Sequence, residues 1–163
     1  MNYFELFDLP VSMKVDRSSL AKKYFELQKQ FHPDFYTQAD DADQTAALEK
    51  SSMINKALKT LQQPDQTIQY VLQLKGLLSE NEKYELPPAF LMEMMELNEK
   101  LVEEEADSFK KEVTGLEDEL YSEVKDIIEN YDDETITTEK LLKIKEYYFK
   151  KKYLHRILDR LDD

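Results

Sequence analysis

The residues best suited to chemistry are His32, Pro33 and Asp34, which directly follow an amphipathic, lysine-bearing segment from Asp16 to Phe31. Proline ends a helix and biases the residue before it away from helical backbone angles. The tripeptide therefore predicts a stiff turn that carries one imidazole and one carboxylate at the end of a charged helix. Such a turn can present hydrogen-bonding groups to another protein, or it can be an ordinary solvated helix end.

The composition predicts an all-α protein. The 163 residues include only two glycines, Gly76 and Gly115, and the proline-free stretches are rich in Glu, Lys and Leu. The net charge of −13 disfavours general binding to nucleic acid or to anionic membranes, and favours a partner with a basic surface. The chain has no cysteine, which excludes disulfides and cysteine-ligated metal centres within it.

The chain also lacks the signals of a membrane protein or an enzyme. No segment reaches the roughly 20 apolar residues that span a bilayer, and MNYFELFDLP is not a secretion leader, so we expect a cytoplasmic protein. An enzyme in which His32 and Asp34 act as base and orienter, or as metal ligands, is disfavoured. The sequence has only two histidines and neither a glycine-rich phosphate loop nor a nucleophile elbow. We expect no catalytic residue, no cofactor and no metal site.

Four helices are predicted in the first half of the chain. Asn2 and Glu5 form a capping pair for a short helix that Pro10 stops, and Asp16 can cap the helix that follows. That second helix carries one apolar stripe, which consists of Leu20, Tyr24, Leu27 and Phe31. Residues 32–44 are polar and predict a loop.

The third and fourth helices follow this loop. The third covers residues 45–61, and its inward face is expected to contain Leu48, Ile54, Leu58 and Leu61. Pro64 can open the fourth helix, and Gly76 suits its C-terminal stop. These helices predict a compact lobe over residues 1–76.

The second half of the chain predicts an antiparallel three-helix bundle over residues 89–163. Residues 77–88 are interpreted as a linker, because Pro87-Pro88 cannot continue a helix. The bundle helices are expected at residues 89–105, 108–130 and 138–161. The middle one carries a single apolar stripe, made of Phe109, Val113, Leu116, Leu120 and Val124.

The first bundle helix has a second apolar surface beside its core-facing stripe of Phe90, Met94, Leu97 and Leu101. Leu91 and Met95 lie around the side of the helix, where they could pack on the second neighbouring helix. Met92 lies almost opposite the stripe, so it favours an adaptable surface that binds a partner. The carboxylates beside Met92 are Glu96, Glu99 and Glu103. An apolar patch with this border predicts a hydrophobic partner surface with a basic edge.

An HPD turn after a lysine-bearing helix resembles the J-domain of DnaJ-type co-chaperones. NYFELFDLP, LQKQFHPDFY, SSMINKALKTLQQP and AFLMEMMELNEKL resemble the HscB family, the J-domain co-chaperones of iron–sulfur cluster assembly. The resemblance covers nearly the whole chain and is thinner between residues 108 and 145. It implies an all-α fold with an N-terminal J-domain, an antiparallel helical hairpin with flanking short helices. A C-terminal antiparallel three-helix bundle would follow.

The resemblance implies that the turn of His32, Pro33 and Asp34 contacts an HscA-like, DnaK-type chaperone and stimulates its ATP hydrolysis. The lysines of the preceding helix, Lys22, Lys23 and Lys29, would steer an acidic patch of the chaperone, or would simply form a solvated face. Lys23 and Lys29 match the HscB pattern. Phe25 and Glu26 stand where general J-domains usually carry adjacent basic residues.

The second implied partner is an IscU-like scaffold on which iron–sulfur clusters are built. The matching contact positions are Leu91, Met92, Met95, Glu96, Glu99, Glu103 and an aromatic residue of the final helix. The stretch KKYLHRI makes that residue Tyr153, in place of the usual phenylalanine, with Tyr147, Tyr148 and Phe149 as alternatives. The implied function is delivery of the scaffold to the chaperone, which promotes cluster transfer. The alternative is a J-domain co-chaperone with an unrelated client.

Overall fold

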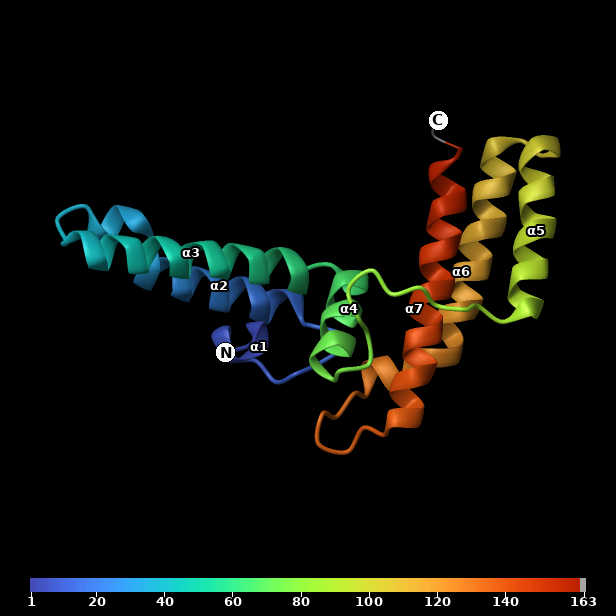
Figure 1. The fold of residues 1–163 in the computed structure, drawn as a ribbon. Coiled ribbons are helices and arrows are strands. Elements are labelled where there is room, and N and C mark those ends of the chain that lie inside the picture. Colours follow the sequence, from blue (N-terminus) through green and yellow to red (C-terminus); the bar gives the residue numbers. More distant parts are fainter. Residues whose placement is uncertain (162–163) are drawn as a thin grey trace. The chain divides into compact units, whose positions relative to one another are not determined.

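The computed structural model describes residues 1–161, and every regular element in that range is a helix, as predicted (Figure 1). The elements are α1 (Tyr3–Leu6), α2 (Arg17–Phe31), the short 3-10 helix η1 (Pro33–Tyr36), α3 (Asp41–Leu61), α4 (Pro64–Leu74), α5 (Pro88–Glu103), α6 (Ala106–Glu129) and α7 (Thr138–Asp159). The chain forms two compact units that meet between Val71 and Leu72, inside α4. None of the helices within residues 1–161 is both long and apolar enough to cross a bilayer.

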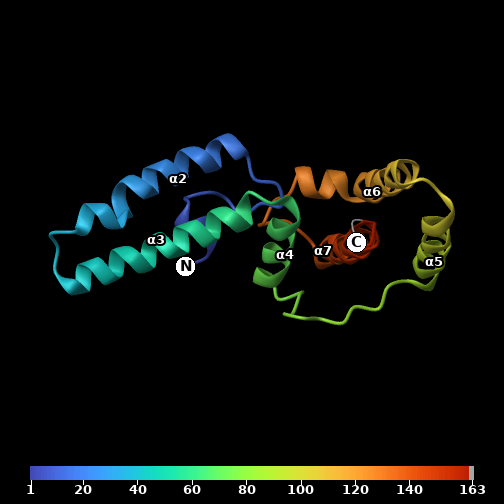
Figure 2. The same ribbon diagram turned by 90° about the horizontal axis from the view of Figure 1, so that it is seen from above.

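In the first unit, α2 and α3 lie side by side as an antiparallel hairpin (Figures 1 and 2). Leu20 and Ile54 are buried between the helices and the N-terminal segment, which contributes Phe4 and Phe7 to the same core. The amide oxygen of Asn55 on α3 accepts hydrogen bonds from the Tyr24 hydroxyl at 3.0 Å and from the Gln28 amide at 3.2 Å, both on α2. These polar contacts hold the hairpin together beyond its apolar core.

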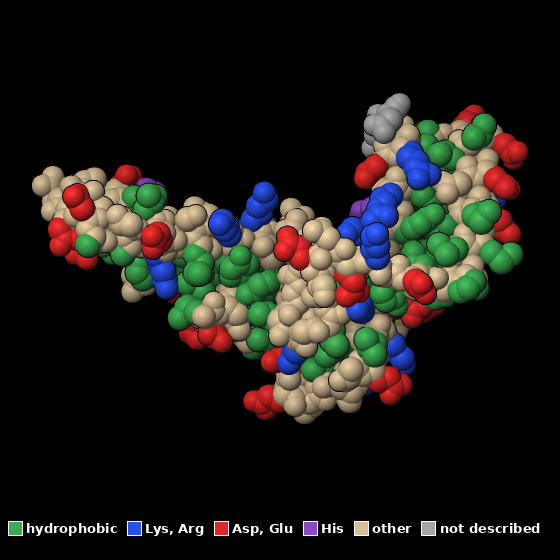
Figure 3. Space-filling view, in the orientation of Figure 1, with side chains coloured by type: hydrophobic (Ala, Val, Ile, Leu, Met, Phe, Trp, Pro, Cys, Tyr) green, Lys and Arg blue, Asp and Glu red, His purple; other side chains and the backbone are tan. Residues whose placement is uncertain are grey.

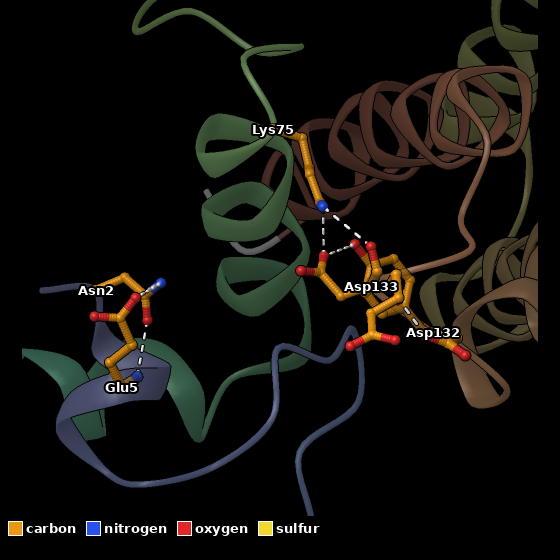
Figure 4. A network of polar contacts seen from close by, with 7 residues as sticks. Asn2, Glu5, Lys75, Asp132 and Asp133 are labelled. Atoms are coloured by element: carbon orange, nitrogen blue, oxygen red, sulfur yellow. Dashed lines mark hydrogen bonds and ion pairs between the residues drawn. The ribbon is translucent and has the colours of Figure 1, made fainter.

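Side-chain caps set the helix starts in this unit, as the sequence predicts. Asn2 accepts a hydrogen bond from the backbone N–H of Glu5 at 2.8 Å (Figure 4), and Asp16 accepts one from Ser19 at 3.0 Å. The hydrogen bonds from the backbone and hydroxyl of Ser19 lower the pKa of Asp16. α1 ends at Leu6, before Pro10 is reached, and the backbone at Asp8 has a positive φ of 52°.

Two expectations for the first unit are wrong. Residues 32–44 are not simply a loop: they contain η1 and the start of α3, because Asp40 caps α3 by accepting a hydrogen bond from Asp43 at 2.8 Å. Leu48 is 60% exposed rather than inward. The buried face of α3 consists of Ala47, Ser51, Ile54, Ala57 and Leu61. Leu48 directly follows Ala47 in the sequence and therefore lies off that face.

In the second unit, α5, α6 and α7 run alternately up and down and form the predicted antiparallel bundle (Figure 1). The core cluster contains Phe90, Met94, Leu97, Phe109, Val113, Leu154 and Ile157. Leu116 and Leu120 pack against this cluster while partly exposed, so the single stripe of α6 faces inward as expected. Thr137 caps α7 by accepting a hydrogen bond from Lys140 at 3.2 Å.

The segment between α4 and α5 is fixed to the second unit at several points. Gly76 follows α4 with a φ of 73°, which suits the predicted helix stop. Lys75 forms a 2.6 Å ion pair with Asp133, which also accepts a 2.8 Å hydrogen bond from the Tyr131 hydroxyl (Figure 4). Leu78 is buried. The functional division into residues 1–76, 77–88 and 89–163 remains a prediction, although residues 77–88 lie wholly in the second compact unit.

Candidate functional sites

The turn after α2 is held in one conformation by local contacts. His32 ends the helix with extended backbone angles (φ −63°, ψ 132°), and Pro33 then opens η1. The Nδ1 atom of His32 accepts a hydrogen bond from the backbone N–H of Asp34 at 3.2 Å. The Tyr36 hydroxyl donates a 2.7 Å hydrogen bond to the carbonyl of Gln30, which ties η1 back to the end of α2. The turn is therefore built before any partner arrives.

The same turn leaves its polar groups accessible. The side chain of His32 is 46% exposed and that of Asp34 is 85% exposed. When Nδ1 accepts this hydrogen bond, the neutral imidazole carries its hydrogen on Nε2, where it can serve as a donor to another molecule; Nδ1 also lies 3.5 Å from the Asp34 carboxylate. Phe35, 67% exposed, lies edge-on to the His32 ring with centroids 6.2 Å apart. One donor, one carboxylate and one apolar ring thus occupy a single corner of the hairpin.

The three lysines of α2 differ in their surroundings. Lys23 Nζ lies 3.4 Å from the Asp8 carboxylate, which draws this lysine toward the N-terminal segment. Lys22 and Lys29 are exposed, and within residues 1–161 neither forms an ion pair. Phe25 is 66% exposed and lies three residues after Lys22 and four before Lys29, so the three side chains share one helix face. The sequence reading did not assign Phe25 to this surface.

On α5, the core-facing and outer residues separate as the helical angles predict. Phe90, Met94 and Leu97 are buried, whereas Met92 and Met95 are 64% and 63% exposed. Met95 therefore projects mainly into solvent, and Leu91, at 37% exposure, lies at the edge of the bundle. The carboxylate side chains Glu96, Glu99 and Glu103 are all exposed. Val102 was not predicted as part of this surface. It is 88% exposed and lies seven residues after Met95 on the same helix face.

Tyr153 is the aromatic residue of α7 that lies beside this surface. It packs edge-to-face on Phe90 with ring centroids 6.1 Å apart, and it lines a concave pocket together with Leu91. Among the alternatives, Tyr147 is buried, and Phe149 stacks on Tyr84 while also lining that pocket. We define the apolar strip as Leu91, Met92, Met95 and Tyr153. Figure 3 shows hydrophobic side chains gathered over α5 and the adjoining part of α7, between acidic and basic side chains.

The second histidine of the chain, His155, has a structural partner. His155 Nε2 lies 2.7 Å from the carboxylate of Glu117, on the neighbouring helix α6. Within residues 1–161, no group of three or more histidine and acidic side chains is arranged to hold a metal ion. The polar turn and the apolar strip belong to different compact units, and both are exposed at the surface.

Comparison with known proteins identifies the class to which this fold belongs. The chain superposes on the crystal structure of human co-chaperone protein HscB with a TM-score of 0.82 and 30% identity, covering 99% of this chain and 81% of that one. Chaperone HscB from Vibrio cholerae gives a TM-score of 0.75 and 29% identity, covering 99% and 96%. The fold and the HPD turn together define the class: a helical J-domain followed by a C-terminal helical bundle, as in these two HscB structures.

Sequence comparison narrows the class to one family. A family model described as the HSCB C-terminal oligomerisation domain matches residues 86–162. The co-chaperone protein HscB homolog of Vibrio cholerae is 43% identical over 102 residues, 62% of this chain and 60% of that protein. The human iron-sulfur cluster co-chaperone protein HscB is 37% identical over 116 residues, 71% of this chain and 49% of that protein. The chain belongs to the HscB family, whose named members are co-chaperones rather than enzymes.

Proposed function

We propose that this protein delivers an IscU-like iron–sulfur scaffold to an HscA-like, DnaK-type chaperone and stimulates the chaperone's ATP hydrolysis. The observation that supports this most strongly is the preorganised, exposed turn of His32, Pro33 and Asp34. The human relative is named as an iron-sulfur cluster co-chaperone, which supports the same cargo. The ATP and its chemistry belong to the chaperone, and the action of this chain is cytoplasmic binding of two partners.

The chaperone contact rests on Asp34 and His32. The Asp34 carboxylate is 85% exposed and can accept a charge-assisted hydrogen bond from an arginine of the chaperone. The Nε2–H of His32 supplies a donor next to it. Because the turn is already ordered by its internal hydrogen bonds, little conformational entropy is lost when the chaperone binds.

Lys22, Lys23 and Lys29 would orient the chaperone on the turn. In a chain with a net charge of −13, a local positive face favours approach of an acidic patch in one orientation. Lys22 and Lys29 are accessible without rearrangement, whereas Lys23 would exchange its contact with Asp8 for one with the chaperone. All three are expected to act on the rate of association more than on the turn itself.

The scaffold contact rests on the apolar strip and on Glu96, Glu99 and Glu103. Exposed thioethers adapt their shape to a partner, and the carboxylates beside them match a partner with a basic edge. When one chain binds both partners, the local concentration of scaffold at the chaperone rises. Stimulated ATP hydrolysis would then close the chaperone on the scaffold and promote cluster transfer.

The experiment that tests the chaperone role is single-turnover ATP hydrolysis by purified HscA-like chaperone with His32→Gln added in place of the wild type. We expect stimulation to be abolished while the circular dichroism spectrum stays unchanged. His155→Gln, which removes the other histidine, is the matched control and should stimulate normally. Stimulation by His32→Gln equal to that of the wild type would refute the assigned role.

A client other than the scaffold is favoured if the wild-type protein stimulates the chaperone's ATP hydrolysis but does not bind purified IscU-like scaffold.

A further inference from the structure

A concave pocket in the second unit adjoins the apolar strip on the side away from its acidic border. The pocket has a volume of about 610 Å³. One wall is the extended segment of residues 82–86, and the opposite wall is the α7 face that carries Phe149, Lys152, Tyr153 and Arg156. Leu91 of α5 closes the third side, so the pocket and the apolar strip are continuous through Leu91 and Tyr153.

The extended wall of the pocket is fixed to α7 by side-chain contacts. The Tyr84 ring stacks on the Phe149 ring with centroids 4.5 Å apart and an angle of 1° between the planes. The carboxylate of Glu82 lies 2.7 Å from Lys145 Nζ, which also lies 5.6 Å from the centroid of the Tyr84 ring. The hydrogen bond from Lys145 lowers the pKa of Glu82, which keeps this carboxylate charged and paired.

The charge of the pocket is positive, in contrast to the chain as a whole. Lys152 and Arg156 are four residues apart on α7 and therefore share one face, and Lys83 stands on the opposite wall. Of the two carboxylates in the lining, Glu82 is paired with Lys145, which leaves Glu85 as the exposed acidic group. Lys152 Nζ lies 5.9 Å from the centroid of the Tyr148 ring, and among residues 1–161 no carboxylate forms an ion pair with Lys152 or Arg156.

The surface around the apolar strip is thus divided by charge. Its α5 side carries Glu96, Glu99 and Glu103, and its α7 side carries Lys152 and Arg156. Figure 3 shows acidic side chains over α5 and basic side chains over α7 on either side of the hydrophobic surface. A partner that covers the strip must satisfy both edges, since an unmatched like charge at a buried interface is costly. A partner that is basic throughout would match the α5 edge and be repelled at the pocket.

We propose that this pocket receives an acidic side chain of the scaffold, flanked by an apolar residue that contacts Leu91 and Tyr153. The proposal rests on the proposed function and adds a second charged contact to it. The carboxylate would bind Lys152 and Arg156, while a basic edge of the scaffold meets the α5 carboxylates. Two opposite charge contacts on either side of one apolar strip fix the orientation of the scaffold, because a reversed scaffold would place like charges together.

The test is isothermal calorimetry with purified IscU-like scaffold and the full-length double variant K152E/R156E. We expect binding to weaken about tenfold at low salt, and the loss to shrink at high salt, where exposed charges are screened. The control is K140E/K143E, which makes the same change in net charge on two exposed residues of α7 outside this pocket. This control should bind as the wild type does. K152Q/R156Q removes the positive charges without adding repulsion and should show the same direction of change.

Each outcome decides a separate point. An equal loss of scaffold affinity in K152E/R156E and K140E/K143E would overturn the proposed pocket contact, because only the net charge of the chain would then matter. Wild-type affinity in K152E/R156E and in K152Q/R156Q would also overturn it, while leaving the proposed function in place. No binding by the wild type would overturn both. Restoration of K152E/R156E by a lysine replacing one acidic residue of the scaffold would support the proposal and identify the occupant.

Discussion

The ring of Tyr84 lies flat on the ring of Phe149, with centroids 4.5 Å apart, although 65 positions separate the two residues in the sequence. This stack joins a segment without secondary structure to the middle of α7. Together with the ion pair of Glu82 and Lys145, it turns the second half of the segment between α4 and α5 into part of the bundle surface. The pocket beside Tyr153 exists because of this attachment.

Removal of the stack should loosen the segment without unfolding the bundle. For Tyr84→Ala we expect a loss of about 1 kcal/mol in the free energy of unfolding, since aromatic pairs contribute roughly 0.5–1.5 kcal/mol beyond area burial. Chemical denaturation followed by circular dichroism measures this loss. Tyr84→Phe keeps the ring and should retain wild-type stability. A Tyr84→Phe variant as unstable as Tyr84→Ala would show that the hydroxyl, rather than the stack, matters.

The two nitrogens of His32 should have separable roles. An asparagine amide oxygen can occupy the position of Nδ1 and accept the hydrogen bond from Asp34, but it supplies no donor in the place of Nε2. His32→Asn should therefore keep the turn and the wild-type melting temperature, yet fail to stimulate the chaperone's ATP hydrolysis. Normal stimulation by His32→Asn would show that the turn geometry, and not the Nε2 donor, is what the chaperone recognises.

Adjacent methionines on α5 should give opposite results. Met94 is 1% exposed, so Met94→Ala should cost about 2–5 kcal/mol of stability through the cavity it leaves. Met95 is 63% exposed, so Met95→Ala should leave stability unchanged and weaken scaffold binding. The triple variant L91A/M92A/M95A should weaken binding further. Unfolding curves and calorimetric titration distinguish the two effects, and an unchanged affinity of the triple variant would return these residues to a purely structural role.

The Asp133 carboxylate should make stability fall in acid. Burial alone would raise the pKa of Asp133, but hydrogen bonds from Lys75 and Tyr131 outweigh burial and lower it below the ordinary 3.8. Because the pKa of Asp133 is lower in the folded state than in the unfolded state, the charged carboxylate stabilises the fold. This stabilisation is complete when the pH is above the unfolded-state pKa, and it is lost as the pH falls through the folded-state pKa.

Asp133→Asn should therefore cost about 0.5 kcal/mol at neutral pH, a small figure because both partners are partly exposed. The difference from the wild type should shrink as the pH falls from about 5 to about 2. Denaturation curves recorded across this range measure the effect. The control is Asp118→Asn, on the exposed side of α6, which should follow the wild type at every pH. A difference that grows in acid would contradict the assigned sign.

The caps of α1, α2 and α7 and the bundle were predictable because the signals are local. Asn2, Asp16 and Thr137 each accept a hydrogen bond from the backbone N–H three residues ahead, and the stripe of α6 needs only a period of 3.6 residues. The separation of Met94 from Met92 and Met95 followed from the same helical angles.

The buried face of α3 and the basic pocket could not be predicted, because they depend on small side chains or on contacts between residues distant in the sequence. The large apolar residue Leu48 is exposed, whereas the buried face of α3 adds the small residues Ala47, Ser51 and Ala57 to the predicted Ile54 and Leu61. The basic pocket was not predictable either. In the sequence, Lys152 and Arg156 are an ordinary pair of charges on one helix face, and they line a pocket only because residues 82–86 lie next to them in the fold. Attachment of that segment depends on a stack and an ion pair whose partners are more than 60 positions apart.

The high exposure of Met92 and Met95 also has a chemical consequence. A thioether open to solvent is oxidised by peroxide to a sulfoxide, which replaces an apolar, flexible group with a polar one. Met94, one position away, is shielded by the bundle. Oxidation would thus alter the proposed scaffold-binding surface while sparing the core beneath it, and methionine sulfoxide reductases would restore the surface without refolding.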